Sequence, residues 1–111
     1  MATPREFVPL SMWKLKGRAK DALHDISSIG AGADGSLWLL SDKSQRVARL
    51  ALDEPLRPDD DEVTELDEIW DLPDGVVKPE GIVALTDGRV LVAMDTTATS
   101  RNGMIVARPL A

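Results

Sequence analysis

An internal repeat is the feature that most constrains the fold of this 111-residue chain. The segment DISSIGAGADGSLWLLSD, residues 25–42, aligns without a gap on KPEGIVALTDGRVLVAMD, residues 78–95, at a constant offset of 53. Both segments carry Asp-Gly at the same place, and each is preceded by a tryptophan strand, around Trp13 and Trp70. A fixed period of this length indicates a repeated supersecondary unit. The chain is therefore predicted to hold two copies of one unit: a tryptophan strand, a loop and three further strands.

The first copy contains GAGADG, residues 30–35, which matches the G-x-G-x-x-G pattern of dinucleotide-binding loops. Such a loop must open a helix, whereas here the strand-like run SLWLLS follows at once, which argues against a nucleotide site. Asp-Gly between two apolar runs predicts a hairpin with a type I′ turn, in which both central residues have positive φ. The second copy has Val83 and Leu85 in place of the first two glycines. We expect the glycines of the first copy to permit a close backbone approach around a narrow axis.

The apolar patterning is strand-like in almost the whole chain, with short apolar runs bounded by turn residues. KGRAKDALHD, residues 16–25, is expected to be a loop that holds at most a single helical turn. Four short antiparallel strands repeating at this spacing are typical of a β-propeller blade. We predict an all-β module over residues 1–111 with two blades of four antiparallel strands, repeat 1 covering about 11–52 and repeat 2 about 66–110. The tryptophan strand would be the outermost strand of one blade and lead into the innermost strand of the next.

Two stretches resemble the SdiA-regulated and esterase-like phytase families of six-bladed β-propellers. PEGIVALTDGRVLVAMD is similar to their Pro-Glu-Gly start followed by an Asp-Gly hairpin, and DISSIGAGADGSLWLLSDKSQRVARLAL is similar to the repeat that precedes it. The resemblance covers roughly residues 25–108. It implies a six-bladed fold, and it associates the chain with relatives that bind calcium or hydrolyse phosphoesters.

The length of the chain conflicts with a single-chain six-bladed propeller, which needs over twice as many residues. Two blades alone would leave sheet edges and apolar blade faces exposed, and three copies in a closed ring would bury them. We therefore expect a homotrimer, with other homo-oligomers or a fragment of a larger propeller as the alternatives. We also expect the Trp13 strand to pair with the third strand near residues 104–107, in the same or a neighbouring chain.

The net charge of −6 argues against a nucleic-acid partner and against an anionic membrane surface, because both require clustered Lys and Arg. The chain has no cysteine, so disulfides and thiolate metal sites are excluded. The first 17 residues lack an apolar core of signal-peptide length, and no run approaches a membrane span. We expect a soluble chain, cytoplasmic as it stands, or periplasmic or secreted if an export signal has been removed.

In a propeller blade, the start of the innermost strand and the end of the second strand lie on the same face of the disc. The candidate ligand-binding residues on that face are Glu80, Asp95, Asp42, His24, Asp25, Arg101 and Asn102. Glu80 is also the candidate metal ligand, since carboxylates converging on a narrow axis favour calcium. Two alternatives stay open: the aspartates at 42 and 95 cap their own loops, and the histidine is either a general base or simply solvated.

Two functions are compatible with these residues. The first is a non-enzymatic propeller module that binds a small ligand or partner protein, and the second is a metal-dependent esterase or phosphoesterase. An excised fragment without independent activity is a further alternative, and no catalytic residue is assigned. The acidic run at residues 53–68 lacks the pattern of a calcium loop and is interpreted as a solvated outer loop.

Overall fold

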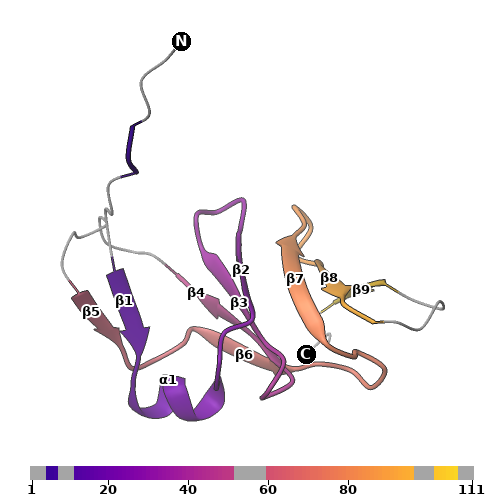
Figure 1. The fold of residues 1–111 in the computed structure, drawn as a ribbon, viewed down its shortest axis with the longest axis horizontal. Helices are drawn as coiled ribbons and strands as arrows, with labels where there is room; N and C mark the ends of the chain where they lie inside the picture. Colours follow the sequence, from indigo (N-terminus) through magenta and orange to yellow (C-terminus); the bar gives the residue numbers. More distant parts are fainter. Residues whose placement is uncertain (1–4, 8–11, 52–59, 97–101, 108–111) are drawn as a thin grey trace.

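The structure is a computed structural model that describes residues 5–7, 12–51, 60–96 and 102–107, and it is mainly β with one short helix (Figure 1). Its elements are β1 (Met12–Leu15), α1 (Gly17–Ala22), β2 (Ser28–Ala31), β3 (Leu37–Ser41), β4 (Arg46–Leu50), β5 (Asp60–Val63), β6 (Glu68–Asp71), β7 (Pro79–Ala84), β8 (Val90–Met94) and β9 (Gly103–Val106). They form a pair, β1-β5, a first sheet, β2-β3-β4-β6, and a second sheet, β7-β8-β9.

The first and second sheets repeat each other strand by strand. β2 pairs antiparallel with β3 so that Ile29 lies opposite Leu39, and β7 pairs with β8 so that Ile82 lies opposite Val92. The second pair is the first one shifted by 53 residues, as the alignment of the two copies predicts. β4 and β9 then add to β3 and β8 in the same antiparallel sense. Each copy therefore contains three consecutive strands in one matching register.

The tryptophan strand of the second copy completes the sheet of the first copy. β6 pairs antiparallel with β4, and Trp70 lies opposite Val47. The predicted outermost position of this strand is thus observed in the first sheet. Among the described residues the second sheet has no corresponding fourth strand, because β9 pairs with β8 alone.

Both Asp-Gly hairpins share one geometry, and it is not type I′. The Gly35 N–H donates to the Gly32 carbonyl at 3.1 Å, and the Gly32 N–H donates to the Ser36 carbonyl at 2.8 Å. Gly35 and Gly88 have φ of 85° and 87°, whereas Asp34 does not have positive φ. This is a type I turn followed by a left-handed glycine. The type I′ prediction is wrong because the carboxylate of Asp34 accepts the Ser36 N–H at 3.0 Å, a local bond that favours the type I conformation.

Side chains alternate between the two faces of each sheet. In the first sheet we distinguish the Trp38 face (Gly30, Trp38, Leu40, Val47 and Trp70) from the Leu39 face (Ile29, Leu37, Leu39, Ala48 and Ile69). In the second sheet we distinguish the Leu91 face (Val83, Leu91 and Ile105) from the Val92 face (Ile82, Val90, Val92 and Met104). By the alignment of the two copies, the Leu91 face corresponds to the Trp38 face and the Val92 face to the Leu39 face.

The Trp38 face of the first sheet packs against the Val92 face of the second. The two sheets lie side by side in Figure 1. This contact forms the main core, in which Leu40 and Val92 are fully buried. A Cβ atom on Gly30 would lie 2.8 Å from the carbonyl oxygen of Ile82, so β2 and β7 approach as closely as glycine permits. The close backbone approach predicted for this part of the first copy is therefore confirmed.

The Leu39 face of the first sheet is covered by the N-terminal elements. Trp13, Leu15 and Leu23 pack around Leu39 and Ala48 in a second, smaller core. α1 spans six residues where a loop with at most one turn was expected. The helix forms because Ala19 and the adjoining Leu23 are buried against the sheet, and tertiary packing rather than propensity stabilises so short a helix. The described part of the chain holds no helix long and apolar enough to cross a membrane.

β5 corrects the interpretation of the acidic run as an entirely solvated loop. Its four residues pair in parallel with β1, and the Lys16 N–H continues the ladder by donating to the Val63 carbonyl at 2.9 Å. A polar segment becomes a strand here because β1 offers it an unpaired edge. β1 therefore pairs with β5 and not with β9, so pairing of the Trp13 strand with the third strand of its own chain is wrong.

Candidate functional site

The predicted ligand-binding residues lie at one end of the two sheets, opposite the Asp-Gly hairpins. His24 and Asp25 precede β2, Asp42 follows β3, Glu80 lies near the start of β7, Asp95 follows β8 and Asn102 precedes β9. We call this the loop end, and the opposite one the hairpin end; both hairpins point the same way in Figure 1. Arg101 lies outside the described residues.

At the loop end of the first sheet, hydrogen bonds tie the candidate residues into the loop. The buried Ser41 hydroxyl donates to the carbonyl oxygen of His24. The Asp42 carboxylate accepts a bond from Gln45 Nε2 at 2.9 Å, and the Asp42 N–H donates to Ser27 Oγ at 2.9 Å. Asp42 thus stabilises its own loop, as the capping alternative for this aspartate requires.

His24 and Asp25 are both exposed. The His24 N–H donates to Ser44 Oγ at 2.9 Å, so the hydrogen bonds of this residue to Ser41 and Ser44 are made by main-chain atoms. The Asp25 carboxylate lies 3.7 Å from Lys43 Nζ, in a surface ion pair. This arrangement orders the main chain and leaves the imidazole at the surface, which fits the solvated alternative for the histidine.

At the loop end of the second sheet, Glu80 is exposed and lies where the register of β7 against β8 shifts. Such irregularities re-aim a side chain relative to a regular strand. Just before it, Lys78 has φ of 46°, and its carbonyl oxygen accepts the Asp95 N–H at 3.0 Å. Asp25, at the equivalent position of the first copy, has φ of 54°. The two copies therefore share a left-handed residue before the innermost strand but present opposite charges there.

Within the described part of one chain, no three His, Cys, Asp or Glu residues come together as a group that could hold a metal ion. Glu80, Asp42 and Asp95 therefore do not form a shared cation site in a single copy. Calcium takes six to eight oxygen ligands.

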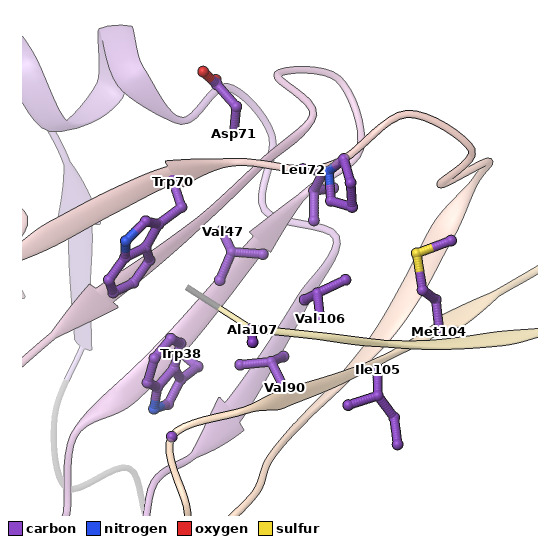
Figure 2. Close-up of a pocket in the computed structure, with 12 residues that line it drawn as sticks. Trp38, Val47, Trp70, Asp71, Leu72, Val90, Met104, Ile105, Val106 and Ala107 are labelled. Atoms are coloured by element: carbon purple, nitrogen blue, oxygen red, sulfur yellow. The ribbon is translucent and has the colours of Figure 1, made fainter. Parts of the chain in front are cut away.

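An apolar groove of about 430 Å³ opens between the sheets beside β9 (Figure 2). It is lined mainly by Trp38, Val47, Trp70, Val90, Met104 and Val106. The rings of Trp38 and Trp70 stack within it, with centroids 5.5 Å apart and planes at 14°. Nothing in the sequence pattern indicated this groove. The groove exists because the first sheet extends to β6 while the second ends at β9, and only the stacking of the sheets reveals that difference.

A polar cleft of about 480 Å³ lies between the two hairpins at the opposite end. There Arg49 Nη2 lies 2.9 Å from Asp34 Oδ2, and Arg49 Nη1 lies 3.6 Å from Glu68 Oε1. The hydroxyl and N–H of Ser36, together with Arg49, hold the pKa of Asp34 well below its ordinary value. The hydrogen bond that Arg49 donates to Asp34 in turn raises the pKa of Arg49. Arg49 thus forms ion pairs with both carboxylates and links the first hairpin to β6.

No family model matches this chain, and neither does a curated protein or a solved structure. The similarity of residues 25–108 to SdiA-regulated and phytase-like propellers therefore stays a sequence-based hypothesis. Function has to be argued from the stacking of the sheets and the chemistry of the loop end.

Proposed function

We propose that the chain is a β-propeller repeat module whose two larger sheets are blades, that three copies close a six-bladed ring, and that this ring binds a small ligand or partner protein at the loop end. One observation carries the proposal: the two sheets stack head to tail, the Trp38 face against the Val92 face. Because the two contacting faces are not equivalent, a related contact can form between copies, with the inner strands set further apart where Val83 replaces Gly30. The Leu91 face of one copy would then pack on the Leu39 face of the next.

Both of these remaining faces expose apolar side chains. On the Leu91 face, Val83, Leu91 and Ile105 form one row across three strands and are 54%, 36% and 55% exposed. On the Leu39 face, Ile29 and Ile69 end a similar row and are 49% and 43% exposed. Contiguous exposed apolar patches mark association surfaces. Repetition of the internal contact would bury both rows.

The stack is also wedge-shaped, which favours a ring over an open filament. The sheets are closest at their inner strands, where the Gly30 position meets the main chain of Ile82. They diverge toward the outer strands, where the groove opens between Trp70 and Met104. A row of such wedges curves toward the inner strands and closes after four to eight blades in typical propellers. With two blades in each chain, three copies give the six blades that the family resemblance implies.

The ligand part of the proposal rests on Glu80, which is exposed near the start of the inner strand β7. A ring of three copies brings three Glu80 carboxylates toward the axis, where they repel one another. A bound cation relieves that repulsion, and calcium suits carboxylate oxygens. Loops at such an opening commonly carry the binding function, while the strands form the scaffold.

Light scattering of a dilute sample tests the ring. The expected result is about three times the chain mass of 12.0 kDa. A well-dispersed species at the mass of one chain would overturn the ring.

Thermal melts with calcium and with a chelator test the ligand. Millimolar calcium is expected to raise the melting temperature of the wild type and of the control Glu65→Gln, which alters another exposed carboxylate. Glu80→Gln is expected to abolish the calcium-dependent shift while leaving the assembled mass unchanged. If calcium leaves the wild-type melting temperature unchanged, Glu80 is not a calcium ligand, whatever the mass of the assembly.

A further inference from the structure

The second sheet ends one strand short of the first. In the first sheet the fourth place is filled by β6, whose Trp70 lies opposite Val47 of β4. In the second sheet the corresponding edge belongs to β9, and no strand pairs with it among the described residues. An unpaired edge of this kind presents a row of main-chain donors and acceptors to another strand.

β1 is the counterpart of β6 in the sequence, since Trp13 and Trp70 hold the same place before the two copies. It is also the counterpart in space. Trp70 and Leu72 pack on the core that contains the Val92 face, and Trp13 and Leu15 pack on the core of the Leu39 face in the same way. β1 therefore already stands where the outermost strand of a preceding sheet would stand.

The connections that follow β1 and β6 also place equivalent residues in equivalent surroundings. Leu23 lies between β1 and the Leu39 face and is 1% exposed, and Val76, 53 residues later, lies in the core between the two sheets and is 6% exposed. Since Val76 sits between two sheets, its equivalent Leu23 marks a place where a preceding sheet belongs. The missing part of that sheet is its three inner strands, which correspond to β7, β8 and β9.

The strands β7, β8 and β9 of the same copy do not fill this place. Figure 1 shows β1 and β5 at one end of the row of sheets and β9 at the other, with the first sheet between them. β1 uses one of its edges to pair with β5, and its other edge carries no strand in the part of the chain that the structure describes.

We infer that β1 of one copy supplies the fourth strand of the second sheet of another copy, running antiparallel to β9. This deepens the proposed ring by naming the segment that joins its copies, but it needs only two chains to be true. The β4-β6 pairing defines the register: transferred to β9 and β1, it puts Trp13 opposite Gly103 and Lys14 opposite Asn102.

The surface that would receive Trp13 has room for an indole. In this register Trp13 lies next to Gly103, at the end of a row of small residues on the Leu91 face: Gly81, Ala93 and Gly103. The neighbouring row contains Leu91, at the position where the first sheet has the tryptophan that stacks on Trp70. The donated strand would also lie next to the apolar groove beside β9.

Cysteine cross-linking tests this register, because the natural chain has no cysteine. Lys14 and Asn102 are both exposed, so the double variant Lys14→Cys/Asn102→Cys leaves both cores intact. Directly opposed residues in antiparallel strands lie about 4.5–5.5 Å apart, within reach of a disulfide. Oxidation is expected to link chains covalently, so that a non-reducing gel shows species larger than two chains or a closed two-chain species.

Three controls make the result decisive. Each single variant is expected to give at most a trace of two-chain species. The pair Lys14→Cys/Glu62→Cys lies on opposed residues of β1 and β5 and is expected to close within one chain, which shows that oxidation works. Under reducing conditions the double variant should keep the wild-type mass by light scattering.

The outcomes separate this inference from the ring. A ladder that ends at three linked chains supports both, and one that ends at two linked chains supports strand donation and overturns the three-copy ring. An assembled protein whose chains stay unlinked, while Lys14→Cys/Glu62→Cys closes, overturns strand donation and leaves the ring standing. A protein that is monomeric and unlinked overturns both.

Discussion

The two sheets share a sequence pattern, a hairpin geometry and a register, yet they differ in what surrounds them. Leu39 and Val92, at equivalent positions, are both 0% exposed. The first sheet has a fourth strand, packs on the second sheet through its Trp38 face and is partly covered on its Leu39 face. Among the described residues, the second sheet has an open edge at β9 and an uncovered Leu91 face. The repeated sequence therefore determines the strands and the register of each sheet. The position of a sheet in the stack determines which of its faces and edges are buried.

The largest expected effect is a difference in the free energy of unfolding between one substitution on the Leu39 face and the same substitution on the Leu91 face. Leu39→Ala removes a fully buried side chain and is expected to lower the free energy of unfolding by about 2–5 kcal/mol. The same substitution at Leu91, which is 36% exposed, should cost less than about 1 kcal/mol in dilute protein. Urea unfolding of both variants measures the difference. Equal losses in dilute protein would contradict the contrast, and a loss for Leu91→Ala that grows with protein concentration would indicate association through that face.

The next largest effect on stability is expected when a residue of one copy is replaced by its equivalent from the other copy. Gly30→Val places in the first sheet the residue that the second has at Val83, and its Cβ would meet the Ile82 carbonyl oxygen at 2.8 Å. Because that carbonyl belongs to a paired strand, we expect overpacking to destabilise the fold by about 1–3 kcal/mol. The reverse change, Val83→Gly, should cost only about 0.5–1 kcal/mol, as glycine does in a strand. Thermal unfolding of both variants tests this, and a harmless Gly30→Val would show that the sheets can separate there.

The smallest expected effect is a difference between the two hairpins in how strongly they make the melting temperature depend on pH under acidic conditions. Hydrogen bonds from Ser36 and Arg49 lower the pKa of Asp34, and bonds from Arg89 lower the pKa of Asp87. A carboxylate whose pKa is lower in the folded state stabilises the fold above its ordinary pKa of about 3.9, and that stabilisation is lost as the pH falls through the folded value. Asp34→Asn should therefore flatten the fall in melting temperature between about pH 5 and pH 2 more than Asp87→Asn does. Equal slopes in the two variants would show that the extra bonds of Asp34 contribute nothing in solution.

Much of the strand arrangement was predictable because it depends on local pattern. The constant offset, the Asp-Gly pairs and the alternating apolar residues led to the six strands of the two copies and to the outermost place of the Trp70 strand. The exclusion of a nucleotide loop at residues 30–35 followed from the strand directly after it. Even the close approach at Gly30 was indicated, because glycine in a strand permits a close approach of the main chains.

The failures have a common physical cause. The turn type depends on a hydrogen bond that the Asp34 carboxylate accepts from the main chain. The helix α1 depends on the burial of Ala19 and Leu23, and β5 depends on the edge that β1 offers it. None of these leaves a periodic signal in the sequence. At the loop end, sequence reasoning grouped Glu80, Asp42 and Asp95 by their place on the strands, but within one chain they form no metal cluster.

The sequence by itself determined that this protein is built from two copies of one β unit, since short-range alternation and turn chemistry are properties of neighbouring residues. Only the tertiary structure decided which faces meet and which stay open. Stacking the Trp38 face on the Val92 face buries one pair of surfaces. In the described part of the chain it leaves an unpaired edge at β9 and an apolar row at Val83, Leu91 and Ile105. Burial is a property of residues far apart in the chain, so the surfaces that would join one copy to another became visible only when the two sheets were seen together.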